Sequence, residues 1–184
     1  MISFFEEVIK MRSSGLVFGL IIGLAIAAIL IKAANKDGKF KTKYDERQEA
    51  VRGKAYKYSF YTLLFFEVLR IIPESGNLLT GISSFYISLF GILLGCFVLC
   101  VHSIWNGAYW GLNNNKRTYF IIFIFATIIN ALPVIGCLSS GGKISFNEDL
   151  SPMINVMVIV WLALIGVVAL IKKMITPKEE NGEG

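Results

Sequence analysis

Four stretches of the chain, each 17 to 20 residues long, contain no Asp, Glu, Lys or Arg: residues 15–31, 85–104, 119–138 and 153–171. A helix needs about 20 mostly apolar residues to cross the hydrocarbon core of a bilayer. Each stretch is therefore predicted to span a membrane. The composition agrees, because 55% of the residues are hydrophobic and 17% are charged, whereas soluble domains have about 45–50% and about 25%. An ordinary soluble domain and a disordered chain are both excluded.

The distribution of basic residues predicts the topology. Half of the 18 Lys and Arg residues lie within residues 32–57, so this connection is expected in the cytoplasm and the N-terminus outside. Residues 58–72 form a shorter apolar stretch that carries two charges. If this stretch also crosses, the basic residues at 116–117 and 172–173 reach the cytoplasmic side as well. The sequence therefore predicts an all-α, polytopic transmembrane helical bundle with five spans, N-terminus out and C-terminus in.

Two terminal segments are predicted to lie outside the spans. Residues 1–14 have apolar side chains at helical spacing, which favours a short helix at the outer interface, and a frayed tail is the alternative. Residues 172–184 are expected to be a disordered cytoplasmic tail. A cleaved signal peptide is disfavoured, because cleavage after Ala34 would place Lys32 where a small residue is required.

Small residues recur every four positions in two of the spans. Such stripes let helices approach closely in lipid, where van der Waals contact is the main attractive force. Packing within the chain and formation of a homodimer both explain them, with packing favoured. The residues predicted to lie in such helix contacts are Gly15, Gly19, Gly23, Ala27, Gly91 and Gly95.

Four residues with charged or amide side chains are predicted within the spans: Glu67, Arg70, Asn130 and Asn155. A charge in hydrocarbon costs at least about 2.5–3.5 kcal/mol, so the first two require an explanation. Glu67 and Arg70 are three residues apart on one helical face and could neutralise each other. A structural ion pair is the favoured interpretation, and an ionisable relay in a transport path, with the two asparagines lining the same cavity, is the alternative.

The sequence contains no pattern of a known catalytic site, neither H-E-x-x-H nor G-x-S-x-G nor a phosphate-binding loop. Cys96 and Cys100 share a helical face, but His102 projects away from them and three ligands are incomplete for structural zinc. We therefore expect a non-enzymatic protein with no cofactor and no bound metal. Direct contact with nucleic acid is not expected either, because the basic residues flank membrane spans.

The cytoplasmic connection contains a dense segment of mixed charge at residues 44–57. Spacings of three and four residues, between Glu49 and Arg52 and between Gln48 and Arg52, favour a charged helix that continues into the second span. Residues 36–43 carry four lysines and one aspartate and are expected to attract anionic headgroups. The mixed-charge portion suits a specific protein contact better, although a solvated helix without a partner is the simpler alternative.

The juxtamembrane segment reads D-E-R-Q at 45–48 and R-G-K-A at 52–55. It resembles the corresponding segment of a family of small, uncharacterised multi-span membrane proteins of bacteria and archaea. The resemblance covers about 20 residues. It implies a prokaryotic cytoplasmic (inner) membrane location and no established activity. Members are often encoded beside a small helix-turn-helix regulator, which implies a regulatory partner.

Two functions are compatible with these features. The first is a scaffold or signalling partner that recruits a cytoplasmic or membrane protein through its juxtamembrane helix. The second is a small transporter or transporter subunit that uses Glu67. For the first, the residues predicted to bind the partner are Asp45, Glu46, Arg47, Gln48, Glu49, Arg52 and Lys54.

Overall fold

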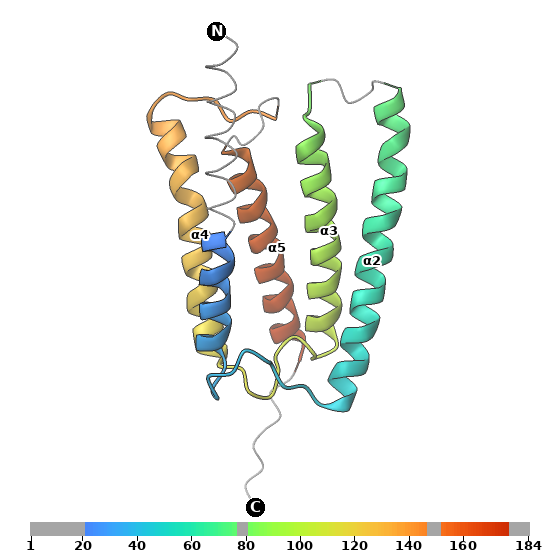
Figure 1. The fold of residues 1–184 in the computed structure, drawn as a ribbon, viewed down its shortest axis with the longest axis vertical. Coiled ribbons are helices and arrows are strands. Elements are labelled where there is room, and N and C mark those ends of the chain that lie inside the picture. Colours follow the sequence, from blue (N-terminus) through green and yellow to red (C-terminus); the bar gives the residue numbers. More distant parts are fainter. Residues whose placement is uncertain (1–20, 77–80, 147–151, 177–184) are drawn as a thin grey trace, which may run out of the picture. The chain divides into compact units, whose positions relative to one another are not determined.

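The computed structural model describes residues 21–76, 81–146 and 152–176, and within these ranges it is all-helical and contains no strand. Its elements are the helix Ile21–Ala34 and the helices α2 (Glu46–Ser75), α3 (Ser84–Trp105), α4 (Lys116–Ser139) and α5 (Met153–Ile175) (Figure 1). The predicted helix at residues 1–14, Gly15, Gly19 and residues 177–184 of the predicted tail lie outside the described residues.

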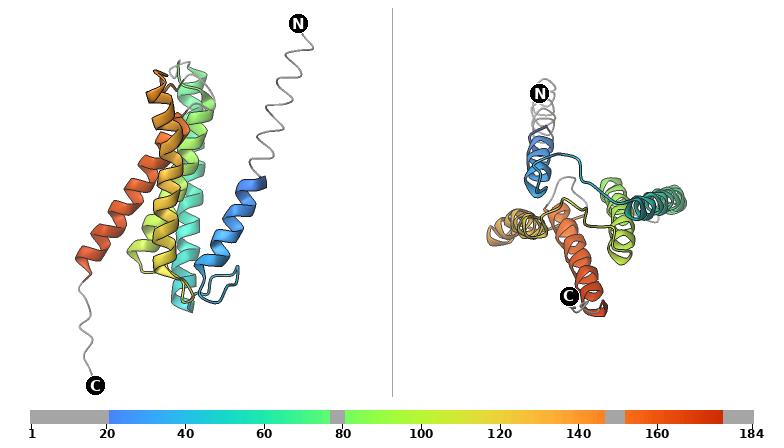
Figure 2. Two further views of the ribbon diagram at one scale, coloured as in Figure 1. Left: turned by 90° about the vertical axis from the view of Figure 1, so that its left-hand side faces the viewer. Right: turned by 90° about the horizontal axis from the view of Figure 1, so that it is seen from below.

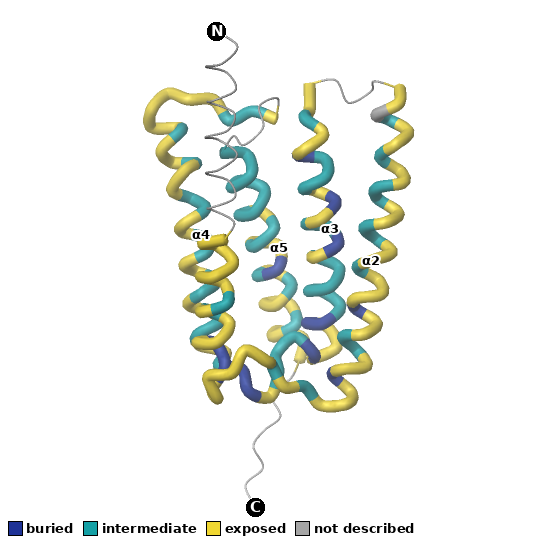
Figure 3. The backbone as a smooth tube through the Cα atoms, in the orientation of Figure 1, coloured by how far each residue is buried: buried dark blue, intermediate teal, exposed yellow. Residues whose placement is uncertain are grey.

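Three helices, α3, α4 and α5, are long and apolar enough to cross a membrane. They cover the predicted spans 85–104, 119–138 and 153–171. Buried positions are few along α2 and α5 (Figure 3). On α2, for example, Phe65 and Ile72 are each 66% exposed. In water, exposing apolar surface costs a free energy of roughly 25 cal/mol per Å². Contact with lipid chains removes this cost.

The charged segment and the predicted second span belong to one helix. α2 runs without a break for 30 residues and includes Pro73 near its C-terminal end. Pro73 lies three residues before Gly76, whose N–H makes the last bond of the helix, to the carbonyl of Ile72. Because α2 is one continuous helix, its first three turns, which carry the charged segment, continue directly into its apolar part.

The chain divides into two compact units. The first unit contains the helix Ile21–Ala34, the segment 35–43 and residues 112–122. The second contains α2, α3, α5 and the part of α4 from Phe123 onward. Within the second unit, α3 packs antiparallel against α2 and also contacts α5, and Figure 1 and the right-hand view of Figure 2 show α2 and α3 side by side.

Two glycines of α3 allow α2 to approach closely. A Cβ at Gly91 would lie 2.5 Å from the ring of Phe66, and one at Gly95 would lie 3.4 Å from the carbonyl oxygen of Ser59. The Ser59 hydroxyl donates to the carbonyl of Gly95 at 2.7 Å. Gly91 and Gly95 therefore serve packing within the chain.

The first-span stripe lacks such contacts in the part that the structure describes. A Cβ at Gly23 would have no atom within 4 Å apart from the backbone of its own helix, and Ala27 is exposed. Its use in packing or in a homodimer remains a prediction.

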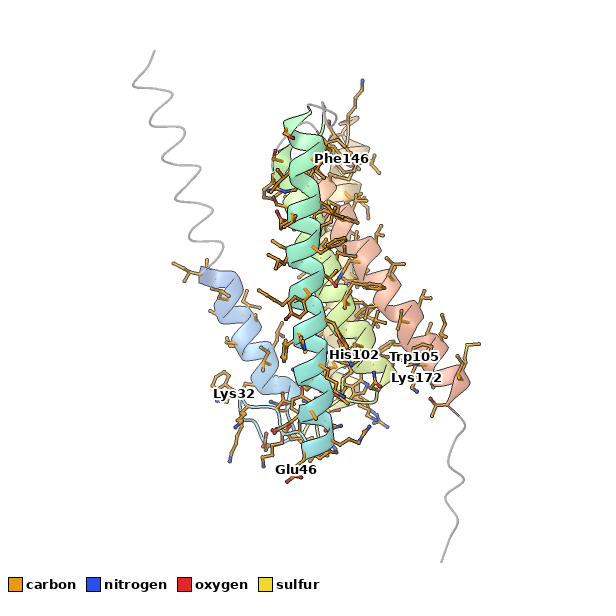
Figure 4. The ribbon with its side chains drawn as sticks, turned by 90° about the vertical axis from the view of Figure 1, so that its right-hand side faces the viewer. Lys32, Glu46, His102, Trp105, Phe146 and Lys172 are labelled. Atoms are coloured by element: carbon orange, nitrogen blue, oxygen red, sulfur yellow. The ribbon has the colours of Figure 1, made fainter. Side chains whose placement is uncertain are left out.

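The contact of α3 with α5 combines a hydrogen bond and a cation–π pair. The indole N–H of Trp161 donates to the carbonyl of Leu93 at 2.8 Å. At the other end of the contact, the Lys172 ammonium lies 5.7 Å from the centre of the Trp105 ring, and Figure 4 shows these two side chains together. The basic last turn of α5 is thereby held beside the C-terminal end of α3.

Candidate functional site

α2 begins with a reciprocal pair of hydrogen bonds. The carboxylate of Asp45 accepts from the backbone N–H of Gln48 at 2.6 Å, and the side-chain oxygen of Gln48 accepts from the N–H of Asp45 at 3.3 Å. This is a capping box, in which side chains satisfy backbone donors that the first turn of a helix leaves unpaired. The Asp45 and Gln48 positions of the D-E-R-Q segment thus start the helix.

Gln48 also anchors the loop that follows α3. The amide nitrogen of Gln48 donates to the carbonyls of Gly107, at 3.2 Å, and Trp110, at 3.1 Å. Gln48 is only 7% exposed. Arg47 donates to the carbonyl of Asn106 at 3.2 Å. Gly107 has a φ of +68°, a conformation that glycine adopts without strain.

Three residues predicted to bind a partner therefore have internal roles. Asp45 caps α2, and Gln48 and Arg47 hold the loop 106–111. Charge and residue type alone do not distinguish these inward-bonded side chains from the exposed ones of the same segment. Gln48 lies seven residues before Ala55, a spacing that places both residues on the same side of a helix. Ala55 is 1% exposed, so this side of α2 faces inward.

Arg52 lies against aromatic rings instead of pairing with Glu49. Its guanidinium lies 4.2 Å from the centre of the Tyr44 ring and 5.4 Å from that of Tyr56, and it donates to the Tyr56 hydroxyl at 2.6 Å. Planar guanidinium groups stack readily on such rings. The predicted Glu49–Arg52 and Gln48–Arg52 pairs are replaced by this arrangement.

The side of α2 opposite Gln48 is exposed. At about 100° per residue, Glu46, Ala50, Gly53 and Lys57 fall on this side, and all four are exposed. Glu49 and Lys54 flank them and are also exposed. We call these six residues the outer face of α2. It combines small residues at its centre with acids toward the helix start and lysines further along, and sequence reasoning had included only Glu46, Glu49 and Lys54.

In the first unit, three consecutive asparagines fix a basic loop. The Asn114 amide donates to the side-chain oxygen of Asn35 at 2.7 Å, and these residues are 6% and 4% exposed. The Asn113 amide donates to the Asp37 carboxylate at 3.0 Å, and its oxygen accepts from the N–H of Lys43 at 2.7 Å. Backbone bonds from Lys36 to Asn113 and from Asn115 to Ala34 close the junction.

The pKa of the Asp37 carboxyl is lowered below its ordinary value. The amide hydrogen bond from Asn113 is the main cause, and the Lys39 N–H and the charge of Lys43, whose ammonium lies 3.6 Å away, add to it. Partial desolvation opposes the shift. Sequence reasoning missed this junction, although a run of three asparagines between two predicted spans is itself a turn signal.

Glu67 and Arg70 form an ion pair. Their side chains are 2.9 Å apart, and Arg70 also donates to the Ser88 hydroxyl of α3 at 3.1 Å. The Asn130 amide donates to the carbonyl of Ala126 within its own helix, at 2.8 Å. Asn155 lies in the first turn of α5. The structure thus joins Glu67 to Arg70, and the Asn130 amide bonds within its own helix.

Cys96, Cys100 and His102 all lie on α3. Cys96 is exposed on α3, and the His102 ring packs edge-on against Tyr58 with centres 5.1 Å apart. Among the described residues, no group of three or more His, Cys, Asp or Glu side chains is arranged to hold a metal ion.

No protein-family model, curated protein or solved structure matches this chain. The resemblance of the D-E-R-Q segment to a family of small membrane proteins therefore remains a prediction. Function must be argued from the residues themselves.

Proposed function

We propose that this chain is a non-enzymatic integral membrane protein that acts as a scaffold or signalling partner, and that it binds another protein through the outer face of α2. One observation carries the proposal. The inner side of the first three turns is fixed by Gln48 and Arg47, while the outer face makes no ion pair within the described residues. All six residues are exposed and accessible to another protein, and the Lys57 ammonium also lies 5.9 Å from the centre of the Tyr61 ring.

A fixed helix is a favourable docking element. Because the loop 106–111 already holds the start of α2, a partner need not order it, and less conformational entropy is lost on binding. Three turns give a contact about 16 Å long. The centre at Ala50 and Gly53 permits close approach of a partner backbone. The acids and lysines around it supply charge complementarity, which favours one partner and orientation over others.

The proposed topology has five spans, with the N-terminus out, the C-terminus in and α2 crossing, in the inner membrane of a prokaryote. Within the second unit, Arg47 contacts Asn106 just past α3, and Lys172 of α5 contacts Trp105. The charged start of α2 and the basic end of α5 therefore lie at the same end of α3. The excess of lysine and arginine in cytoplasmic loops supports placing that end inside.

The Glu67–Arg70 pair supports a structural role more than transport. A glutamate already neutralised by Arg70, which also bonds Ser88, is poorly placed to exchange protons or cations. A transport defect confined to Glu67→Gln, with unchanged stability, would favour the transporter alternative.

Crosslinked affinity purification from native membranes tests the partner proposal. Gly53→Leu adds bulk to the outer face where no heavy atom lies within 4 Å, so the fold should tolerate it. Gly136→Leu on α4, also in open space, is the matched control. A protein captured by the wild type and Gly136→Leu, but lost with Gly53→Leu and with Glu46→Ala, Glu49→Ala and Lys54→Ala combined, supports the proposal. Equal capture by all chains contradicts it.

A further inference from the structure

The first unit contains an open pocket of about 540 Å³ lined by Lys36, Asn114, Asn115, Lys116 and Arg117. Lys36 follows the helix Ile21–Ala34, Asn114 and Asn115 directly precede α4, and Lys116 and Arg117 begin it, so segments almost 80 positions apart in the sequence form one wall. The backbone bond from Asn115 to Ala34 and the buried Asn35–Asn114 pair hold these segments together.

The pocket presents cations and no carboxylate. Lys36, Lys116 and Arg117 are exposed, and none forms an ion pair with any carboxylate of the described residues. The nearby Asp37 is engaged by Asn113 and Lys43 instead. Three positive charges around one hollow, with amide groups between them, match an anion that carries several acceptor oxygens, as a phosphate does.

The surroundings of the pocket match a membrane surface. The helix Ile21–Ala34 and α4 are both apolar, and the pocket lies where the first ends and the second begins. Two large apolar side chains of the adjoining loops, Phe40 and Leu112, are 61% and 63% exposed. Apolar groups beside lysines are typical of segments that lie in the headgroup region of a bilayer.

We infer that this pocket binds the phosphate of an anionic phospholipid. The inference goes beyond the partner site on α2 and requires only that the flanking helices lie in a membrane. A basic pocket at the end of membrane helices provides both charge and position for a headgroup. At the strength typical of basic residues near anionic lipid, removing all three charges should weaken lipid binding by about 100-fold.

Native mass spectrometry of the full chain in detergent, titrated with phosphatidylglycerol, measures this binding. The pocket variant combines Lys36→Gln, Lys116→Gln and Arg117→Gln. The control variant removes the same charge outside the pocket and outside residues 36–43, by Lys54→Gln, Lys57→Gln and Lys173→Gln. Phosphatidylcholine and inorganic phosphate serve as the neutral lipid and the soluble anion. A third variant, Lys36→Arg with Lys116→Arg, changes two of the same side chains and preserves their charge.

The expected result is strong phosphatidylglycerol binding by the wild type, the control and the arginine variant, loss in the pocket variant, and weak binding of phosphatidylcholine and phosphate throughout. Equal weakening in the pocket and control variants would overturn the inference, because the attraction would then be spread over the basic surface. Inorganic phosphate binding as tightly as the lipid would also overturn it, by assigning the pocket to a soluble anion. Loss of binding in the arginine variant would contradict recognition by charge.

Discussion

Asp45 and Gln48 bind each other's backbone N–H groups at the start of α2, and Gln48 extends this contact to the carbonyls of Gly107 and Trp110. One amide side chain thus joins the beginning of α2 to the end of α3. The spacing of D-x-x-Q follows from this geometry, because a capping box needs its two members three residues apart. The contact also separates the inner side of the helix from the exposed side on which partner binding is proposed.

Replacing Gln48 by alanine is expected to lower the free energy of unfolding by about 1–3 kcal/mol. The change removes one side of the capping box and leaves two loop carbonyls without their donor. Unfolding in mixed detergent micelles, followed by circular dichroism, measures the loss. Glu49→Ala, on the exposed side, is the control and should change stability by less than about 0.5 kcal/mol. Equal effects of the two variants would show that the Gln48 contacts are unimportant.

Gly91→Ala is expected to destabilise the contact between α2 and α3 by about 1–3 kcal/mol. The added methyl group would lie 2.5 Å from the ring of Phe66, which cannot move freely because it packs on Phe90 with centres 5.6 Å apart. Gly136→Ala adds the same group to open space and should be neutral or stabilising by up to about 1 kcal/mol. The same unfolding measurement compares them. Unchanged stability of Gly91→Ala would argue against close packing at this point.

The ion pair between Glu67 and Arg70 is expected to show energetic coupling. Glu67→Gln and Arg70→Gln should each lower stability by more than about 1 kcal/mol, because each leaves a charge without its counter-ion in an apolar setting. The double variant should lose less than the sum, with a coupling energy of about 0.5–3 kcal/mol. A double-mutant cycle in detergent provides this number. Additive losses would mean that the two residues act independently.

Asp37 is expected to make the first-unit loop sensitive to acid. Its pKa is lower in the folded chain than the ordinary value of 3.8, so the stabilisation it provides is present above about pH 4 and is lost as the pH falls through the folded-state pKa. Hydrogen exchange at the N–H of Leu112, which bonds the Lys43 carbonyl, reports on the loop. Protection in the wild type should exceed that in Asp37→Ala at neutral pH and approach it in acid. A constant difference across this range would exclude a role for the carboxylate charge.

Much of the helical architecture could be predicted from the sequence because length and apolar composition determine it. The runs 85–104, 119–138 and 153–171 correspond to α3, α4 and α5 within a few residues. The Glu67–Arg70 pair was also predictable, since residues three apart on a helix share a face. The helices and this ion pair both depend on residues close together in the sequence.

The candidate sites depend on contacts between distant segments, which periodicity does not encode. Gln48 bonds Trp110, 62 positions away, and Asn114 bonds Asn35, 79 positions away. For the same reason, the sequence did not reveal that Lys36 and Arg117 line one pocket. It assigned Asp45 and Arg47 to a partner because their charge was visible while their hydrogen-bond partners within the chain were not.

Cysteine labelling of the two ends of the helices tests the central claim most directly, since partner binding in the cytoplasm requires the outer face of α2 to lie on the cytoplasmic side of the membrane. In a chain with Cys96, Cys100 and Cys137 replaced by alanine, Lys54→Cys and Lys143→Cys each introduce one exposed thiol. We predict that a membrane-impermeant maleimide labels Lys143→Cys on intact cells and labels Lys54→Cys only after permeabilisation. Protection of both thiols in intact cells would mean that α2 does not cross, and labelling of Lys54→Cys from outside would place its outer face beyond the reach of any cytoplasmic partner.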